Sequence, residues 1–392
     1  MASTAGFGKG PESGPGGAAP YESREDFTAQ SIRTEFQKAS QGIGRFNLAI
    51  FGKTGVGKST LINAIFGKEI AATGIGRPVT PGRHFYLHET NRLGILDNRG
   101  LEIADEPGKL LAEFAAYLDE GRAKPIFEQI HVVWYCVAAP SGRFEDGEAA
   151  FVRGLADLGM PVILVLTQTR RRDGRLHPDH EKLADHIAGL ALPIYQGRAY
   201  PVFAVADEFS AQATYGLQEL LDATFRLAPT VVEAAITAAQ RVDMLRKNDA
   251  AQKAIALATT LAAGAGATPI PFSDAALLVP IQLAMMGKIA AIYDIELERA
   301  AIAALAATTA ATQVGRSAAA SLFKLIPVAG WVVGGAISAS VASAITVAMG
   351  GAWHVICKRA YTGEIDLVAL NSSALRDMFK KEVRRKLPGG SK

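Results

Sequence analysis

The sequence predicts an α/β domain with a six-stranded, mostly parallel sheet, followed by an all-α, alanine-rich helical domain. In the first part of the chain, short apolar runs alternate with segments of helical periodicity, which is the pattern of a parallel sheet. Beyond about residue 228 no strand pattern remains, and long alanine-rich segments follow one another. The chain has 392 residues, which is enough for two domains that each bury a core.

Each expected element has its own apolar run. The expected strands are residues 46–51, 84–88, 92–96, 131–137, 162–166 and 200–205. Helices are expected at 148–158 and 180–190, and a closing helix begins at Gly216. The expected helical segments of the second domain are 230–248, 252–264, 273–293, 297–312, 328–349 and 365–386, with breaks at Pro269, Pro271 and Pro327.

These patterns divide the chain into five parts. Residues 1–20 are mostly Gly, Ala, Pro and Ser, a composition that buries too little surface to order itself, so a disordered tail is expected. The others are an N-terminal helix at 21–44, an α/β domain at 45–227, a connecting helix at 228–249 and a helical domain at 250–387.

The best-defined motif is a phosphate-binding loop. Residues 52–59 read GKTGVGKS and fit G-x-x-x-x-G-K-[ST], with a strand expected before the motif and a helix after it. Glycines let backbone N–H groups turn toward a phosphate, and the helix start adds the positive end of a dipole. The predicted nucleotide-binding residues of this loop are Gly52, Lys53, Thr54, Gly55, Val56, Gly57, Lys58, Ser59 and Thr60.

Asp97, Thr80 and Gly100 are expected to complete, together with Ser59 of the loop, a site for Mg²⁺ and the γ-phosphate. Asp97 ends an apolar strand and opens an Asp-x-x-Gly turn that closes at Gly100, whose amide suits a γ-phosphate contact. Ser59 and Thr80 would supply hydroxyls to Mg²⁺. A surface turn at 97–100 and a solvated threonine at 80 are the alternatives.

Together, residues 52–59, Thr80 and 97–100 resemble the Era-like branch of the small GTPase superfamily, over roughly residues 45–227. The resemblance implies a six-stranded α/β fold and Mg²⁺-dependent binding and hydrolysis of GTP to GDP.

The base-reading motif departs from this family. The family pattern is Asn/Thr-Lys-x-Asp, whereas the fifth strand here ends in TQTR at residues 167–170. Thr167 fits the pattern, Gln168 replaces Lys, and Arg170 replaces the Asp that reads guanine. Ala206 is compatible with the family's backbone contact to the base. GTP is therefore expected from the overall resemblance, and ATP stays open as an alternative.

The hydrolytic residues also differ from the Ras pattern. Leu101 stands where Ras has its water-orienting glutamine, as is common in Era-like proteins. Gly55 stands where some of them carry an asparagine for K⁺, so no K⁺ activation is expected. Lys58, Thr80 and Gly100 are the predicted catalytic residues, together with Arg77 as a cis arginine, although a solvated loop arginine is the commoner use of such a residue. Slow turnover, raised by a partner or by self-association, is expected.

Composition limits the other functions. The net charge of +3 gives no reason to expect nucleic-acid binding, and Cys136 and Cys357 are too few for a disulfide framework. Without a secretory signal, the expected location is the cytoplasm, with possible association at the inner face of the membrane.

The helical part carries, in this order, TPIPFSD at residues 268–274, PIQ at 280–282, IAAIY at 289–293 and KLIPVAG at 324–330. With these motifs it resembles the YcjF-type domain found beside Era-like domains in bacteria, over about residues 250–356. Residues 325–357 carry no Asp, Glu, Lys or Arg, but they are rich in small residues. A buried hairpin in a helical bundle and contact with a membrane are both open. The basic run at 380–386 fits an anionic lipid surface or a solvated helix end. A homo-oligomer is a third possible use of this domain.

The function expected is a Mg²⁺-dependent GTP-binding and slowly GTP-hydrolysing switch. Its helical domain would transmit the nucleotide state to a membrane, a partner or a second copy. The alternative is a soluble nucleotide-binding regulatory module with weak base specificity and negligible hydrolysis.

Overall fold

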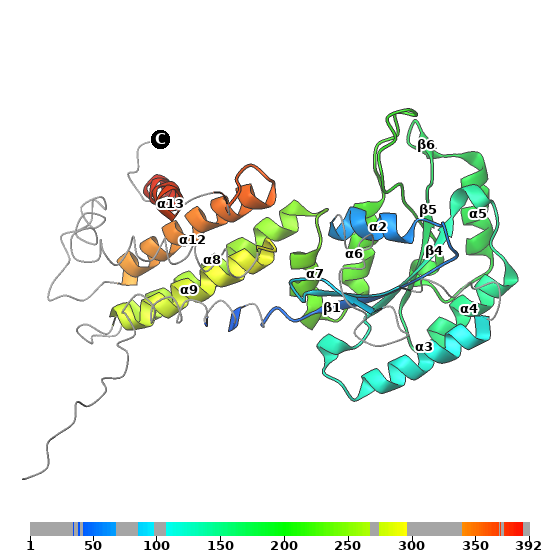
Figure 1. Cartoon of the computed structure of the whole chain (residues 1–392), viewed down its shortest axis with the longest axis horizontal. Coiled ribbons are helices and arrows are strands. Elements are labelled where there is room, and N and C mark those ends of the chain that lie inside the picture. Colours follow the sequence, from blue (N-terminus) through cyan, green and yellow to red (C-terminus); the bar gives the residue numbers. More distant parts are fainter. Residues whose placement is uncertain are drawn as a thin grey trace, which may run out of the picture.

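The computed structural model describes residues 34, 38–39, 42–67, 85–97, 107–266, 274–295, 339–367, 369 and 372–386. Within them, an α/β unit is followed by long helices that extend away from it (Figure 1). The six-stranded, mostly parallel sheet and the helical C-terminal region are both confirmed. The expected tail at 1–20, most of the expected helix at 21–44, the segment 297–312 and the three proline breaks lie outside the described residues.

The sheet has the strand order β2-β3-β1-β4-β5-β8, in which only β2 runs antiparallel to its neighbour. Its strands are β1 (Phe46–Phe51), β2 (Phe85–Leu87), β3 (Leu93–Asp97), β4 (Val132–Ala138), β5 (Val162–Thr167) and β8 (Tyr200–Pro201). β1 and β4 lie in the middle and are almost fully buried, because helices cover both faces of a parallel sheet.

Alternation along the strands sends side chains to two cores. On β4, Trp134 and Cys136 face the core under α2 (Lys58–Phe66), α6 (Leu217–Leu227) and α7 (Glu233–Ala239). Val133 and Tyr135 face the other core, under α3 (Pro107–Arg122), α4 (Asp146–Asp157) and α5 (Pro178–Gly189). Because β1, β3, β4 and β5 are parallel, their carboxyl ends lie at the same edge of the sheet, where loops lead into the helices.

Two details of the α/β unit differ from the sequence prediction. The strand expected at 200–205 pairs with β5 only over Tyr200–Pro201, since Phe203 turns away to pair with Tyr215. A small hairpin, β6 (Arg171–Arg172) and β7 (Arg175–Leu176), follows β5 and was not predicted. Its turn is Asp173–Gly174, and both residues have positive φ, as a two-residue hairpin turn requires.

The segment 228–249, expected as one connecting helix, is divided. It holds the 3₁₀ turn η4 (Thr230–Val232), then α7, and then the start of α8 (Met244–Gly266). The Gln240 side chain accepts hydrogen bonds from the N–H groups of Val242 and Asp243, and the N–H of Arg241 donates to Ile65 at the end of α2. These bonds replace the helical ones and break the helix.

The helical region packs α8, α9 (Asp274–Ile292), α12 (Ala339–Tyr361) and α13 (Ser372–Lys386) around Trp353, which is fully buried. A Cβ on Gly350 would lie 2.7 Å from the sulfur of Met285, so glycine there lets α12 approach α9 closely. Of the described helices, none is both long and apolar enough to cross a bilayer.

Candidate functional site

The predicted phosphate loop links the buried strand β1 to helix α2. Gly52 has φ +135°, and a Cβ there would lie 2.3 Å from the carbonyl oxygen of Cys136 on β4. Gly57, with φ +93°, is the N-cap of α2. As a glycine, Gly57 has no side chain to cap the helix, and the first turn of α2 carries no acidic residue. The helix therefore presents its N–H groups and positive dipole end to a ligand at the loop.

Lys58 is folded back across this loop. Its Nζ donates hydrogen bonds to the carbonyls of Gly52, at 2.7 Å, and Lys53, at 3.0 Å. The ammonium group is thus held inside the ring of backbone that a phosphate would occupy. In the rest of the loop, Val56 is buried, whereas Thr54, Gly55 and Thr60 are exposed.

The side chain of Lys53 points away, to two carboxylates. Its Nζ lies 3.0 Å from Glu145 Oε1 and 3.2 Å from Glu148 Oε2, and Glu148 also accepts a hydrogen bond from Tyr135. Burial lowers the pKa of Lys53, but the hydrogen bonds to the two glutamates outweigh it and raise that pKa above its ordinary value. Neither glutamate was predicted as a partner of the loop, although Glu145-x-x-Glu148 forms a capping box that marks the start of α4.

Asp97 lies beside the strand that leads into the loop, whereas Ser59 is the last residue of the loop itself and lies in the first turn of α2. Asp97 ends β3 beside Ile50 of β1, and it is buried, with 4% of its surface exposed. Burial raises the pKa of Cys136 to about 12, with smaller and opposite effects from the charges of Lys58 and Asp97. A carboxylate and a hydroxyl are hard oxygen donors, which fit Mg²⁺. Among the described residues as a whole, no group of three or more His, Cys, Asp or Glu side chains is arranged to hold a metal ion.

Three of the predicted site residues, Arg77, Thr80 and Gly100, lie outside the described residues. Their assignments to catalysis and, for Thr80, to Mg²⁺ stay predictions.

The end of β5 is fastened to the phosphate loop. The buried hydroxyl of Thr167 is hydrogen-bonded to the carbonyl of Val56, and Nε2 of Gln168 donates to the carbonyl of Gly55 at 3.2 Å. Gln168 has φ +56°, which turns the chain sharply after the strand. The structure thus brings the predicted base-side residues Thr167 and Gln168 together with the predicted phosphate-side residues.

Beyond Gln168 the chain turns outward. Thr169 is fully buried and bonded to the hydroxyl of Tyr215, whereas the side chain of Arg170 is exposed at the base of the β6–β7 hairpin. Ala206 is exposed in the loop after β8 and precedes Asp207. Hydrogen bonds with Ser210 lower the pKa of Asp207, and the charge of Arg170 adds to this effect, so Arg170 faces this loop.

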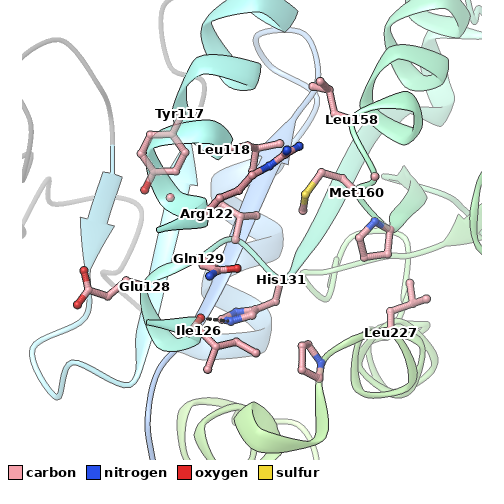
Figure 2. Close-up of a pocket in the computed structure, with 15 residues that line it drawn as sticks. Tyr117, Leu118, Arg122, Ile126, Glu128, Gln129, His131, Leu158, Met160 and Leu227 are labelled. Carbon is pink, nitrogen blue, oxygen red and sulfur yellow. Dashed lines mark hydrogen bonds between the residues drawn. The ribbon is translucent and has the colours of Figure 1, made fainter. Parts of the chain in front are cut away.

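A separate pocket of about 370 Å³ lies at the opposite edge of the sheet, before the start of β4 (Figure 2). His131 lines it, with Nδ1 accepting from the N–H of Asn47 and Nε2 directed at the carbonyl of Ile126. Burial lowers the pKa of His131, and both ring nitrogens are used in the neutral form. We assign this histidine a structural role and place the functional site at the phosphate loop.

Known proteins share this part of the chain. A family profile described as "50S ribosome-binding GTPase" matches residues 47–168, from β1 to Gln168. Magnetosome membrane protein 22 of Magnetospirillum gryphiswaldense is 31% identical over 153 residues, or 38% of this chain and 76% of that protein. The GTPase Der of Rhizobium etli is 32% identical over 134 residues, or 32% of this chain and 26% of Der.

A third relative, the probable GTP-binding protein EngB of Koribacter versatilis, is 27% identical over 198 residues, covering 48% of this chain and 87% of EngB. The matched part of Der is thus about a quarter of its length, whereas most of the other two proteins is covered. The shared segment holds β1, the phosphate loop and α2. Residues 47–168 thus form a domain of the P-loop GTPase type, as the family profile and the GTPase relatives indicate.

Proposed function

We propose that this protein is a Mg²⁺-dependent GTP switch with slow intrinsic hydrolysis, whose helical domain passes the nucleotide state on. The observation that carries the proposal is the phosphate loop with Lys58 folded across it and Asp97 beside it. The narrower assignments we propose are the Era-like branch and a YcjF-type helical domain. The domain limits 45–227 and 250–387 belong to the same proposal.

Each residue would have a distinct task. Lys58 would exchange its two carbonyl partners for β- and γ-phosphate oxygens, and the N–H groups at the start of α2 would hold the phosphates in place. Ser59, Thr80 and Asp97 would hold Mg²⁺, which neutralises phosphate charge when bound. Thr167, Gln168 and Ala206 would border the base, and Gly100 and Arg77 would face the γ-phosphate.

Equilibrium binding of GTP and ATP in Mg²⁺, with Lys58→Ala as the control, tests the site. We expect tight binding of GTP to the wild type and a loss of at least about tenfold in the variant, since a buried charge-assisted contact is removed. Equal affinity of the two nucleotides would favour the second candidate, a regulatory module with weak base specificity. Arg170, in place of the guanine-reading carboxylate, is the observation behind that candidate.

Slow turnover is tested by measuring specific activity against protein concentration. The site would rely on residues supplied by a partner or a second copy, because Leu101 replaces the usual glutamine. We expect low activity that rises with concentration. Fast turnover that does not depend on concentration would contradict this.

Two observations support the proposal that the helical domain transmits the nucleotide state to a membrane. Leu257 and Leu261 of α8 and Val347 of α12 are each about half exposed, and α13 ends in exposed Arg384, Arg385 and Lys386. Exposed apolar side chains and a basic helix end are both features that suit an anionic lipid surface, and one relative is named as a magnetosome membrane protein. Flotation with anionic liposomes, with and without GTP, separates membrane binding from a purely protein-directed switch in the cytoplasm.

A further inference from the structure

A buried ion pair joins the helical region to the turn between β2 and β3. Nη1 of Arg92, directly before β3, lies 2.8 Å from Oδ1 of Asp294, two residues beyond the end of α9. Their side chains are only 3% and 8% exposed, although the residues are 202 positions apart. His88, at the other side of the turn, has Nε2 4.0 Å from Oδ2 of the same aspartate.

Each partner is held firmly in its own part of the molecule. Asp294 has φ +54° and donates its N–H to the carbonyl of Ala291 at the end of α9. The carbonyl of Arg92 accepts a hydrogen bond of 2.9 Å from the N–H of Phe46, the first residue of β1. The ion pair therefore connects two rigid elements, the end of α9 and the base of the sheet.

The helices beside this pair are tied to one another by Lys247. This fully buried residue of α8 donates hydrogen bonds of 2.7 Å to the carbonyls of Ala238 on α7 and Ile292 on α9. Asp294 thus belongs to a junction of three helices, and a displacement of β3 against it would move the base of the helical region as a unit.

β3 leads from this junction to the predicted Mg²⁺ site. Arg92 precedes the strand, and Asp97 is its last residue, five positions further on. β3 pairs on one side with β1, which is the strand that leads into the phosphate loop, and on the other side with β2. A strand transmits a shift along its own axis because its backbone is fully extended.

We propose that Asp294 is a positioning residue for the GTPase site, acting through Arg92 on β3 and thereby on Asp97. Through this pair the helical region senses which nucleotide is bound. The inference rests on the proposed function, because it requires that the GDP and GTP states differ at the end of β3.

Thermodynamic linkage separates this role from a merely structural one. A contact whose strength differs between the two nucleotide states must change the two nucleotide affinities by different factors. A contact that only holds the fold together changes both affinities equally or changes neither. The ratio of the two dissociation constants is therefore the quantity to measure.

The experiment compares Asp294→Asn with the wild type in equilibrium binding of GDP and of a non-hydrolysable GTP analogue, in Mg²⁺. We expect the ratio of the two Kd values to change at least about threefold. Asp294→Glu, which keeps the carboxylate, should restore the ratio at least in part. If Asp294→Asn does not fold, Arg92→Lys, which keeps the charge and loses the forked geometry, takes its place in the same measurement.

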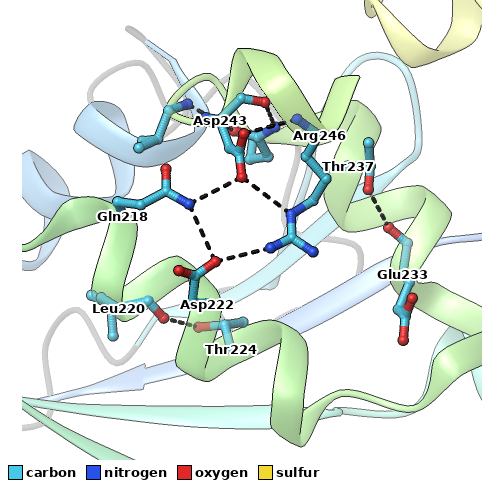
Figure 3. Close-up of polar contacts among 10 residues, drawn as sticks. Gln218, Leu220, Asp222, Thr224, Glu233, Thr237, Asp243 and Arg246 are labelled. Atoms are coloured by element: carbon cyan, nitrogen blue, oxygen red, sulfur yellow. Dashed lines mark hydrogen bonds and ion pairs between the residues drawn. The ribbon is translucent and has the colours of Figure 1, made fainter. Parts of the chain in front are cut away.

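The matched control is Asp222→Asn. Asp222 of α6 lies 2.9 Å from Arg246 of α8, and Gln218 and Asp243 complete this network (Figure 3). It fastens α8 to the α/β unit without touching β3, so the ratio should not change in this variant.

Two outcomes would overturn the inference: an unchanged ratio in Asp294→Asn, or an equal change of the ratio in Asp222→Asn. A wild-type chain that binds no GTP would overturn the proposed function itself, and that result is distinct from an unchanged ratio.

Discussion

The hydroxyl of Thr167 is hydrogen-bonded to the backbone carbonyl of Val56, which joins the end of β5 to the middle of the phosphate loop. The two residues are 111 positions apart, and both are buried. The same hydroxyl lies 3.2 Å from the carbonyl of Val137 on β4, so its single proton is shared between the two carbonyls. One side chain thus joins the ends of the two strands β4 and β5 to the phosphate loop.

Thr167→Val should therefore weaken both the fold and the site. Valine has the same shape but leaves the carbonyl of Val56 without its donor, which costs about 1–3 kcal/mol of unfolding free energy. We expect a lower denaturation midpoint and weaker GTP binding. Thr237→Val, in which the lost bond goes to the i−4 carbonyl of Glu233 in α7, is the control and should leave GTP binding unchanged. Equal GTP affinity in the two variants would contradict the prediction.

Gly52→Ala should be more harmful than an alanine at another glycine with positive φ. The new Cβ would lie 2.3 Å from the Cys136 carbonyl at a φ of +135°. We expect a loss of about 2 kcal/mol or more in unfolding free energy, together with loss of nucleotide binding. Gly142→Ala, at φ +63° with no atom within 4 Å of the new Cβ, should cost only about 1 kcal/mol. Chemical denaturation of both variants tests this, and equal costs would refute it.

Arg170→Asp should raise the preference for GTP over ATP. It restores the carboxylate that accepts hydrogen bonds from guanine at this position of the family motif, and a site with such an acceptor rejects bases that lack the matching donors. We expect the ratio of ATP to GTP dissociation constants to rise by roughly tenfold. Arg172→Asp makes the same charge change on the exposed β6 strand and is the control. If the ratio of dissociation constants rose equally in Arg172→Asp, the change of charge alone would explain the effect.

Lys247 should make stability depend on pH. Burial lowers its pKa from 10.5 to about 7 in the folded protein, so between these values the unfolded chain binds more protons. Unfolding free energy should then rise with pH from about 7 to about 10, by up to about 1.4 kcal/mol per pH unit. Denaturation of the wild type and of Lys247→Met at pH 7, 8 and 9 isolates this contribution, because methionine does not titrate.

The difference in unfolding free energy between wild type and Lys247→Met should therefore grow with pH. Lys253→Met removes an exposed lysine from the same helix and controls for the loss of one charge. A constant difference for Lys247→Met would show that the buried ammonium group stays charged through its two carbonyl partners.

Local patterns determined the sheet and the phosphate loop. Continuous apolar runs predicted both ends of β1, β3, β4 and β5 to within one residue. These strands are buried on both faces, so neighbouring positions along each strand are apolar. The loop glycines and Lys58 were found in the same way, since backbone turns and a phosphate cradle are made by consecutive residues. The alanine-rich composition was enough to predict the helical region.

Only the tertiary structure decided which distant residues meet. Lys53 with Glu148, Thr167 with Val56, and Arg92 with Asp294 are pairs 95, 111 and 202 positions apart. Charged and polar side chains have no periodicity that marks a distant partner. The break after Ala239 has the same origin, because the N–H of Arg241 is used by Ile65 of another element. The sequence by itself thus predicted the phosphate-binding loop from consecutive residues, whereas only the packing of the two regions showed which distant side chains join the helical region to the sheet.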